Sequence, residues 1–102
     1  MLLLDEPFGM LDSLTRYELQ EVLISLWRRE RITAMIVTHD VDEAIYMADR
    51  VMVLSQRPTH VVETIRIELP TPRDQIVSRA DPAFLKMRER VLTQIRSMRA
   101  AA

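Results

Sequence analysis

The sequence predicts an α/β fold with a mostly parallel sheet and flanking helices, and three observations lead to this prediction. An apolar run at residues 2–4 ends in two adjacent carboxylates, Asp5 and Glu6. A stretch whose apolar residues recur at helical spacing follows, and a second run rich in β-branched residues occupies positions 32–38. Strands buried on both faces of a parallel sheet read as continuous apolar runs, and crossover helices join them.

Asp5 and Glu6 stand at the carboxyl end of the first predicted strand, where α/β folds bind their ligands. Pro7 ends this strand, because proline cannot donate to a sheet. Successive side chains of a strand point to opposite faces, so we expect the two carboxylates to divide the work. One can hold a hydrated magnesium ion while the other orients a water. The alternative is a strand end that carries two solvated acids.

The next residues predict a strand–helix–strand unit. Asp12 or Ser13 can cap a helix that runs to about Arg31. Its apolar residues at helical spacing are Leu19, Val22, Leu23, Leu26 and Trp27. A crossover helix makes the strand at 32–38 parallel to the first, with both carboxyl ends at one edge. We therefore expect His39 beside Asp5 and Glu6; the alternative is a histidine that only satisfies groups at a helix end.

Shorter elements follow. Asp40 and Glu43 are spaced as a capping box for a helix that ends near Asp49. A strand is expected at 51–54, a turn at 56–59 and a half-exposed antiparallel strand at 60–69, whose inner face would carry Val61, Ile65, Ile67 and Leu69. Prolines at 70 and 72 indicate a linker, and Pro82 opens a last helix. Its expected apolar face is Phe84, Val91, Leu92, Ile95 and Met98. The predicted domains are therefore 1–69, and 70–102 with the linker and C-terminal helix.

Composition narrows the class of protein. The 102 residues are 48% apolar and 28% charged, which suits one globular unit at most. Residues 1–50 carry 5 basic and 10 acidic side chains, and residues 51–102 carry 9 and 5. Neither half is basic enough to demand nucleic acid. The chain has no cysteine, which excludes disulfides and thiolate metal sites. No apolar run approaches the ~20 residues of a membrane span, and the start does not read as a signal peptide.

Three short motifs resemble those of the ATP-binding cassette (ABC) ATPases. Met1 to Glu6, four apolar residues before Asp-Glu, is similar to the Walker B segment. Residues 9–12, Gly-Met-Leu-Asp, resemble the D-loop, and residues 37–40, Val-Thr-His-Asp, resemble the H-loop. Each motif alone is weak, but the three in this order are specific. Thr-His-Asp-Val-Asp-Glu-Ala at 38–44 and Arg-Ala-Asp-Pro-Ala-Phe-Leu at 79–85 look most like importers of nitrate, sulfonate and taurine.

The resemblance implies a P-loop NTPase fold that hydrolyses ATP with Mg²⁺. Asp5 would hold the water shell of the magnesium ion, Glu6 would polarise the attacking water, and His39 would contact the γ-phosphate. Asp12, besides capping a helix, would act at the nucleotide across a dimer interface. The implied partners are a second ATPase subunit, membrane permease subunits and, indirectly, a substrate-binding protein, with no nucleic acid. The implied location is cytoplasmic and peripheral, on the inner face of the cell membrane.

One part of the phosphate-binding machinery is missing from these residues. A P-loop needs a glycine-rich turn followed by Lys and Ser or Thr, but Gly9 is the only glycine and Lys86 the only lysine. We therefore expect a partial ABC ATPase fold that lacks the N-terminal phosphate-loop half, a fragment that is inactive alone. Two alternatives stay open: a soluble ABC-type ATPase acting on nucleic acid or ribosomes, and a non-catalytic interaction module derived from an ABC ATPase.

Overall fold

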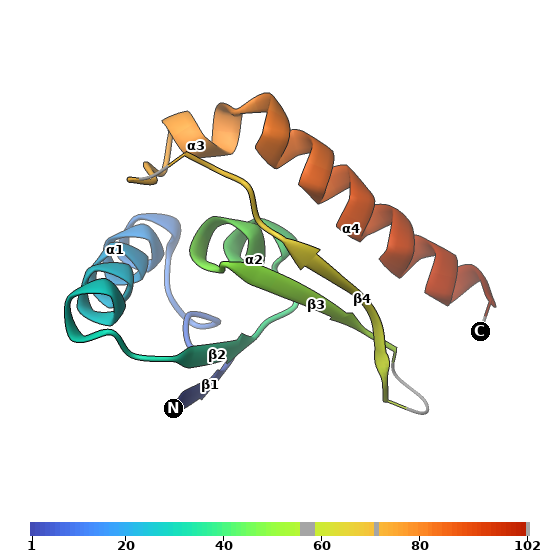
Figure 1. Cartoon of the computed structure of the whole chain (residues 1–102), viewed down its shortest axis with the longest axis horizontal. Coiled ribbons are helices and arrows are strands. Elements are labelled where there is room, and N and C mark those ends of the chain that lie inside the picture. Colours follow the sequence, from blue (N-terminus) through green and yellow to red (C-terminus); the bar gives the residue numbers. More distant parts are fainter. Residues whose placement is uncertain (56–58, 71, 102) are drawn as a thin grey trace. The chain divides into compact units, whose positions relative to one another are not determined.

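The computed structural model describes residues 1–55, 59–70 and 72–101. Its elements are β1 (Leu2–Asp5), α1 (Ser13–Glu30), β2 (Ala34–Val37), α2 (Val41–Met47), β3 (Arg50–Leu54), β4 (Val61–Arg66), α3 (Val77–Ala80) and α4 (Pro82–Ala101), shown in Figure 1. They pack as two units, Met1–Asp40 and Val41–Ala102, and each unit is described by itself. The domain division expected between residues 69 and 70 stays a prediction.

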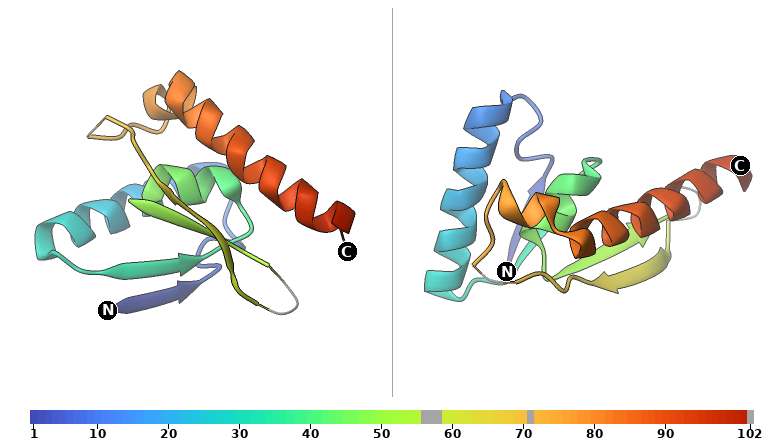
Figure 2. Two further views of the ribbon diagram at one scale, coloured as in Figure 1. Left: turned by 45° about the vertical axis from the view of Figure 1, so that its right-hand side comes forward. Right: turned by 90° about the horizontal axis from the view of Figure 1, so that it is seen from above.

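The first unit is the expected strand–helix–strand. β1 and β2 pair in parallel, with Leu2 opposite Ala34 and Asp5 opposite Val37, and they lie side by side in Figure 2. The backbone N–H of Glu6 extends the ladder by donating to the Val37 carbonyl at 2.8 Å. The parallel pairing is thus confirmed, and it brings the residues after both strands to one edge.

α1 connects these strands and begins and ends as its sequence predicts. Asp12 is its N-cap, and the C-cap Arg31 adopts a left-handed conformation with φ 52°. Arg28 and Arg29 lie in the last turn, where cations are favourable to the helix dipole. The expected apolar face is partly wrong. Gln20 and Ile24, one turn apart, are the buried positions, while Val22 points to solvent because it lies about 200° around the helix from Gln20.

The strands form two separate pairs among the described residues, β1–β2 parallel and β3–β4 antiparallel. The expectation of a mostly parallel sheet therefore holds only for the first pair. β3 alternates cleanly: Val51 and Val53 are buried and Met52 is exposed. This alternation is typical of an antiparallel pair with one face covered.

β4 departs from its predicted face at its start. Ile65 is buried as expected, but Val61 is 51% exposed. The register shifts between Val53, which lies opposite Glu63, and Leu54, which lies opposite Val61. One extra residue on β4 turns Val61 to the other face, which is the effect of a β-bulge. The predicted turn at 56–59 lies mostly outside the described residues.

The second unit has its core where α2, α4 and β3 pack together. Tyr46 and Ile45 of α2 are fully buried, and Phe84 and Val91 of α4 are nearly so. Leu92 was expected on the same face, but it is exposed because it lies about 100° around the helix from Val91. The separate short helix α3 was not predicted from the sequence.

Arg73 closes the carboxyl end of α2. Its Nη1 donates to the carbonyls of Tyr46 at 2.8 Å and of Ala48 at 2.7 Å. Such end carbonyls have no partner within the helix, and a cation there also meets the negative end of the helix dipole. Arg79 lies over the Tyr46 ring, 5.0 Å from its centroid. Across the described residues, no helix is long and apolar enough to cross a membrane.

Candidate functional site

Glu6 lies just beyond β1, in a backbone conformation that favours glycine. Its φ is 47°, and for a non-glycine residue this left-handed conformation carries a cost that clusters at functional sites. Its carbonyl accepts the Gly9 N–H at 3.3 Å, which starts the turn after the strand. The direction of the Glu6 side chain is therefore set by this turn. The strand alternation that predicted opposite directions for the Asp5 and Glu6 side chains therefore does not extend to Glu6.

The Glu6 carboxylate meets His39 across 33 positions of sequence. Glu6 Oε1 accepts the backbone N–H of His39 at 2.8 Å and lies 3.8 Å from His39 Nε2. The two residues come together because β1 and β2 end in register. The imidazole is 92% exposed, so its ring remains accessible to a ligand. The hydrogen bond to Glu6 comes from the backbone of His39 and not from its imidazole, so the role of this ring stays a prediction.

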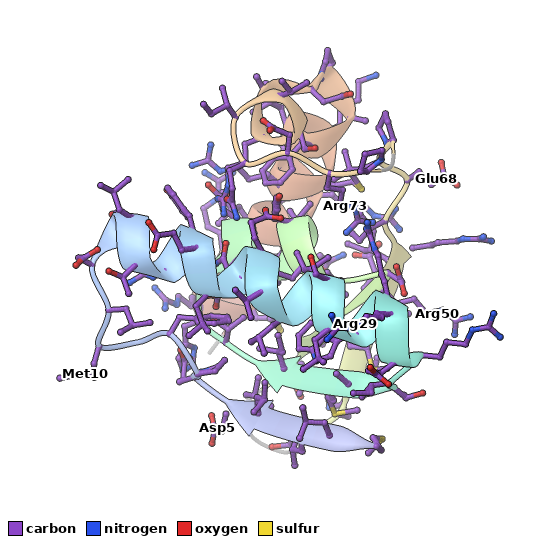
Figure 3. All side chains as sticks on the ribbon, turned by 90° about the vertical axis from the view of Figure 1, so that its left-hand side faces the viewer. Asp5, Met10, Arg29, Arg50, Glu68 and Arg73 are labelled. Atoms are coloured by element: carbon purple, nitrogen blue, oxygen red, sulfur yellow. The ribbon has the colours of Figure 1, made fainter. Side chains whose placement is uncertain are left out.

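Asp5 and Asp12 have different surroundings. Asp5 is the last residue of β1 and its side chain lies at the surface in Figure 3. Asp12 Oδ1 accepts the Thr15 N–H at 2.8 Å, so Asp12 is a helix N-cap. The hydrogen bond from the Thr15 backbone holds the pKa of Asp12 below its ordinary value. The structure thus gives Asp12 a capping role, and its role across a dimer stays a prediction.

Phe8 anchors the turn that carries the D-loop-like residues. Its side chain is buried, and its carbonyl accepts the Leu11 N–H at 3.1 Å. Met10, at the tip, is exposed, as Figure 3 shows. A Cβ at Gly9 would meet its nearest neighbour, the Glu6 carbonyl oxygen, at 3.6 Å, an ordinary contact. The fold of these residues alone therefore does not require glycine at position 9.

Arg16 contacts residues beside two of the candidate site residues, and the sequence did not predict it. Its Nη2 donates to the Leu11 carbonyl at 3.2 Å, and its Nη1 lies 3.6 Å from Asp40 Oδ2. Leu11 precedes Asp12, and Asp40 follows His39. The available signal was the position of Arg16 four residues after Asp12, one helical turn along the same face.

The carboxylates and histidines of the described residues limit how the chain could hold the magnesium ion that the resemblance implies. Among the described residues, no three acidic or histidine side chains gather closely enough to hold a metal ion. A single surface carboxylate such as Asp5 fits a magnesium ion that keeps most of its waters and takes other ligands from phosphate. A single carboxylate cannot surround the ion with protein ligands alone.

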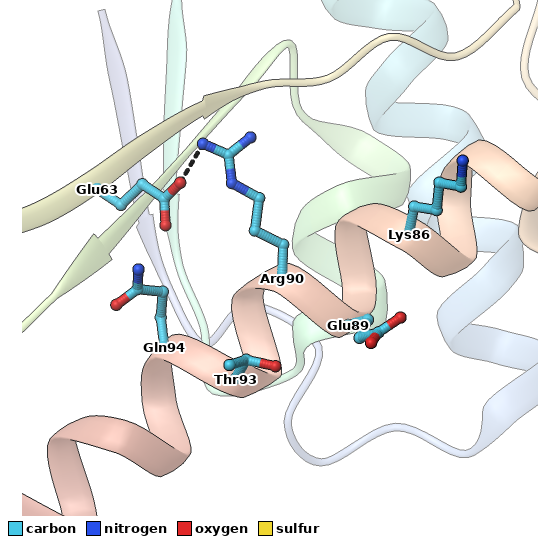
Figure 4. Close-up of a pocket in the computed structure, with 6 residues that line it drawn as sticks. All are labelled: Glu63, Lys86, Glu89, Arg90, Thr93 and Gln94. Carbon is cyan, nitrogen blue, oxygen red and sulfur yellow. Dashed lines mark ion pairs between the residues drawn. The ribbon is translucent and has the colours of Figure 1, made fainter.

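A surface depression of the second unit contains none of these residues. Glu63 of β4 pairs with Arg90 of α4 in Figure 4, and Lys86, Glu89, Thr93 and Gln94 complete its lining. Of its four charged residues, Glu63 and Arg90 are joined to each other, and Lys86 and Glu89 are of opposite sign, so the depression has no net positive charge for an anionic ligand.

Comparison with known proteins gives relatives for nearly the whole chain, although no protein-family model matches it. A Brucella melitensis protein whose name describes it as ATP-binding is 50% identical over 91 residues, which are 89% of this chain and 38% of the relative. The aliphatic sulfonates import ATP-binding protein of Bacillus licheniformis is 45% identical over 94 residues, 92% of this chain and 35% of the relative. That of Pseudomonas syringae pv. tomato is 44% identical over 95 residues, 93% and 39%.

The chain thus spans a little over a third of the length of these relatives. Within that span the identity is high enough to establish common descent, which agrees with the resemblance carried by the three motifs. Over about nine tenths of its length, the chain is homologous to ATP-binding proteins, among them ATP-binding proteins of aliphatic sulfonates import.

Proposed function

We propose that these residues form the part of an ABC import ATPase that positions the attacking water and senses the γ-phosphate of ATP. The completed subunit would pair with a second ATPase subunit and with membrane permease subunits, on the cytoplasmic face of the cell membrane. A substrate-binding protein would supply the solute. The sulfonate importers among the relatives, and the sequence resemblance, support a small anion such as a sulfonate, taurine or nitrate as that solute.

The contact between Glu6 and His39 carries the proposal. A carboxylate and an imidazole meet at the carboxyl ends of two parallel strands, where α/β folds bind their ligands. Phosphoryl transfer requires donors and charges that are already in place around the transferring group, with a water in line. The carboxylate can polarise that water, and the exposed imidazole can donate to a phosphate oxygen.

The hydrogen bond from the His39 backbone gives Glu6 a defined orientation. With Oε1 held by that N–H, Oε2 is the atom proposed to accept a proton from the attacking water. Asp5 is proposed to hold the water shell of magnesium, which when bound would neutralise charge on the phosphates. Asp12, on the other side of the turn, is proposed to face the nucleotide of the partner subunit.

The 102 residues alone are proposed to be inactive, within a partial P-loop fold. They contain no glycine-rich loop followed by Lys and Ser or Thr, since Gly9 is the only glycine and Lys86, the only lysine, follows Phe84 and Leu85. Losing one preorganised donor costs about 10²- to 10³-fold in rate, and here a whole phosphate cradle would be missing. Calorimetry of the purified chain with Mg-ATP should detect no binding; micromolar affinity would contradict this proposal.

A chimera tests the catalytic proposal. In it, this chain replaces the matched 94-residue segment of the Bacillus licheniformis relative. Glu6→Gln should keep nucleotide binding and lower the ATPase rate by about 10²- to 10⁴-fold, because the amide lacks the basicity of the carboxylate. Glu68→Gln, an exposed position beyond β4, is the matched control and should leave the rate unchanged. A Glu6→Gln chimera that hydrolyses ATP within about threefold of its parent excludes Glu6 as the general base.

A further inference from the structure

We propose that Arg16 is a positioning residue that ties the D-loop segment (residues 9–12) to the H-loop segment (residues 37–40). The inference rests on the proposed function, since it assigns a part in the same reaction to a residue outside the three motifs. Arg16 would not touch the nucleotide. It would act by fixing the backbone next to Asp12 relative to the backbone next to His39.

The contacts of one side chain reach both segments. Arg16 Nη2 donates to the Leu11 carbonyl at 3.2 Å, and Nη1 lies 3.6 Å from Asp40 Oδ2. The backbone N–H of Arg16 also donates to the Asp12 carbonyl at 2.9 Å, so the first turn of α1 and the D-loop segment move together. A displacement of either segment therefore stretches a contact to the other.

The guanidinium group is suited to this task. Its planar fork presents several donors in fixed directions, so one side chain can hold two acceptors at once. A lysine ammonium is a single point charge and cannot reproduce both directions. The Arg16 side chain is 28% exposed and that of Asp40 is 43% exposed. A pair this exposed adds little to stability and is screened by salt, so its main effect should fall on geometry.

The expected consequence is a selective loss of turnover. Displacing a reacting group by about 1 Å can cost on the order of 10²-fold in rate, even when the change lies away from the chemistry. In the chimera, Arg16→Ala should lower kcat about 10- to 100-fold while the nucleotide affinity stays within about threefold. Arg16→Lys should fall between the parent and Arg16→Ala. Arg29→Ala, on the last turn of α1 where Arg29 pairs with Glu30, is the control and should match the parent.

A double-mutant cycle separates this role from general destabilisation. Arg16→Ala combined with Asp40→Asn should lose no more kcat than the worse single variant, because both remove the same link. Additive losses would overturn the inference. Raising the salt concentration should lower kcat by a larger factor in the parent than in Arg16→Ala, because only the parent has the exposed pair to lose. If Arg16→Ala does not fold, kcat is measured for Arg16→Lys and Asp40→Asn instead. If neither variant changes kcat, the inference is overturned.

The outcome for Glu6 keeps the two proposals apart. If Glu6→Gln abolishes turnover and the Arg16 variants match the parent, the link is wrong and the catalytic assignment stands. If Glu6→Gln hydrolyses ATP like its parent, the catalytic assignment itself is wrong.

Discussion

Glu6 Oε1 accepts its hydrogen bond from the backbone of His39 and not from the imidazole, which lies farther away at 3.8 Å. The orientation of the carboxylate therefore does not depend on the identity of the side chain at position 39. Substitution of His39 can then test the imidazole without disturbing Glu6.

His39→Ala should leave the fold intact, because alanine keeps the backbone N–H. In the chimera it should lower kcat about 10²-fold by removing one donor to the transferring phosphate, while nucleotide affinity changes little. His60→Ala is the matched control; His60 Nδ1 contacts Ser55 Oγ at 2.7 Å in the second unit. Steady-state ATPase rates and nucleotide titrations measure both effects. Equal rates for the two histidine variants would show that the His39 imidazole does not take part in the reaction.

Asp5→Asn should behave differently from the His39 variant. A carboxylate that meets a metal through water typically contributes about 10- to 100-fold in metal affinity or activity, so both nucleotide affinity in the presence of magnesium and turnover should fall. Asp49→Asn, at an exposed position before β3, provides the comparison. Nucleotide titrations with and without magnesium measure the effect. An Asp5→Asn chimera with unchanged magnesium dependence contradicts the assignment.

The capping bond of Asp12 predicts a pH dependence at low pH. Its pKa is lowered in the folded chain, first by the hydrogen bond from the Thr15 backbone. The native state thus favours the charged form, and the stabilisation is present above the ordinary pKa of 3.8 and lost as the pH falls through the lower folded value. The ¹⁵N shift of the Thr15 amide should report this titration.

Asp12→Asn provides the control for that titration, because asparagine is also a good N-cap but does not titrate. The Thr15 shift should then be flat over the same pH range. Asp12→Ala should lose the cap and lower the unfolding temperature by a few degrees. A Thr15 amide that titrates identically in the parent and in Asp12→Asn would show that another group is responsible.

The sequence predicted the strand–helix–strand unit because its signals are local and agree with one another. Leu2 to Leu4, the Asp12 cap and the β-branched run before His39 each favour one structure, and parallel pairing follows from the crossover. The meeting of Glu6 and His39 follows from that topology. The left-handed backbone of Glu6 was not predictable, since it depends on the turn that Gly9 and Phe8 complete.

The errors share one physical origin, which is packing that local periodicity does not encode. The face of α1 was misplaced because buried Gln20 carries no apolar signal. The bulge in β4 moved Val61 outward, and a register shift has no mark in the composition of a strand. Arg16 was overlooked because its two acceptors come from segments that are separated in sequence.

Arg73 should contribute measurably to the stability of the second unit. Arg73→Met keeps the apolar stem and removes both donors to the Tyr46 and Ala48 carbonyls. Hydrogen bonds from charged groups are each worth about 1.5–3 kcal/mol, so the loss of both should lower the free energy of unfolding by about 3 kcal/mol or more. Arg66→Met, exposed on β4, should stay within about 0.5 kcal/mol of the parent. Denaturant unfolding measures both, and equal values would show that Arg73 does not stabilise α2.

The parallel pair β1–β2 presents an apolar face to solvent. Leu3 is 61% exposed and lies opposite Met35, which is also exposed, in register. Within the first unit of the described residues β1 pairs only with β2, so its outer edge carries unpaired backbone groups beside these apolar side chains. Exposed apolar strands with open edges favour association between copies of a chain. We therefore expect the purified chain to associate as its concentration rises.

Leu3→Lys should suppress that association severalfold, because a charge on the exposed face of β1 opposes its contact with the same face of a second copy. The paired backbone of β1 is unaffected, so helix content should not change. Met10→Lys adds the same charge at the exposed tip of the turn and corrects for any general effect of net charge on solubility. Light scattering across a concentration series compares the three proteins. If Met10→Lys suppresses association as well as Leu3→Lys does, net charge and not the face of β1 controls it.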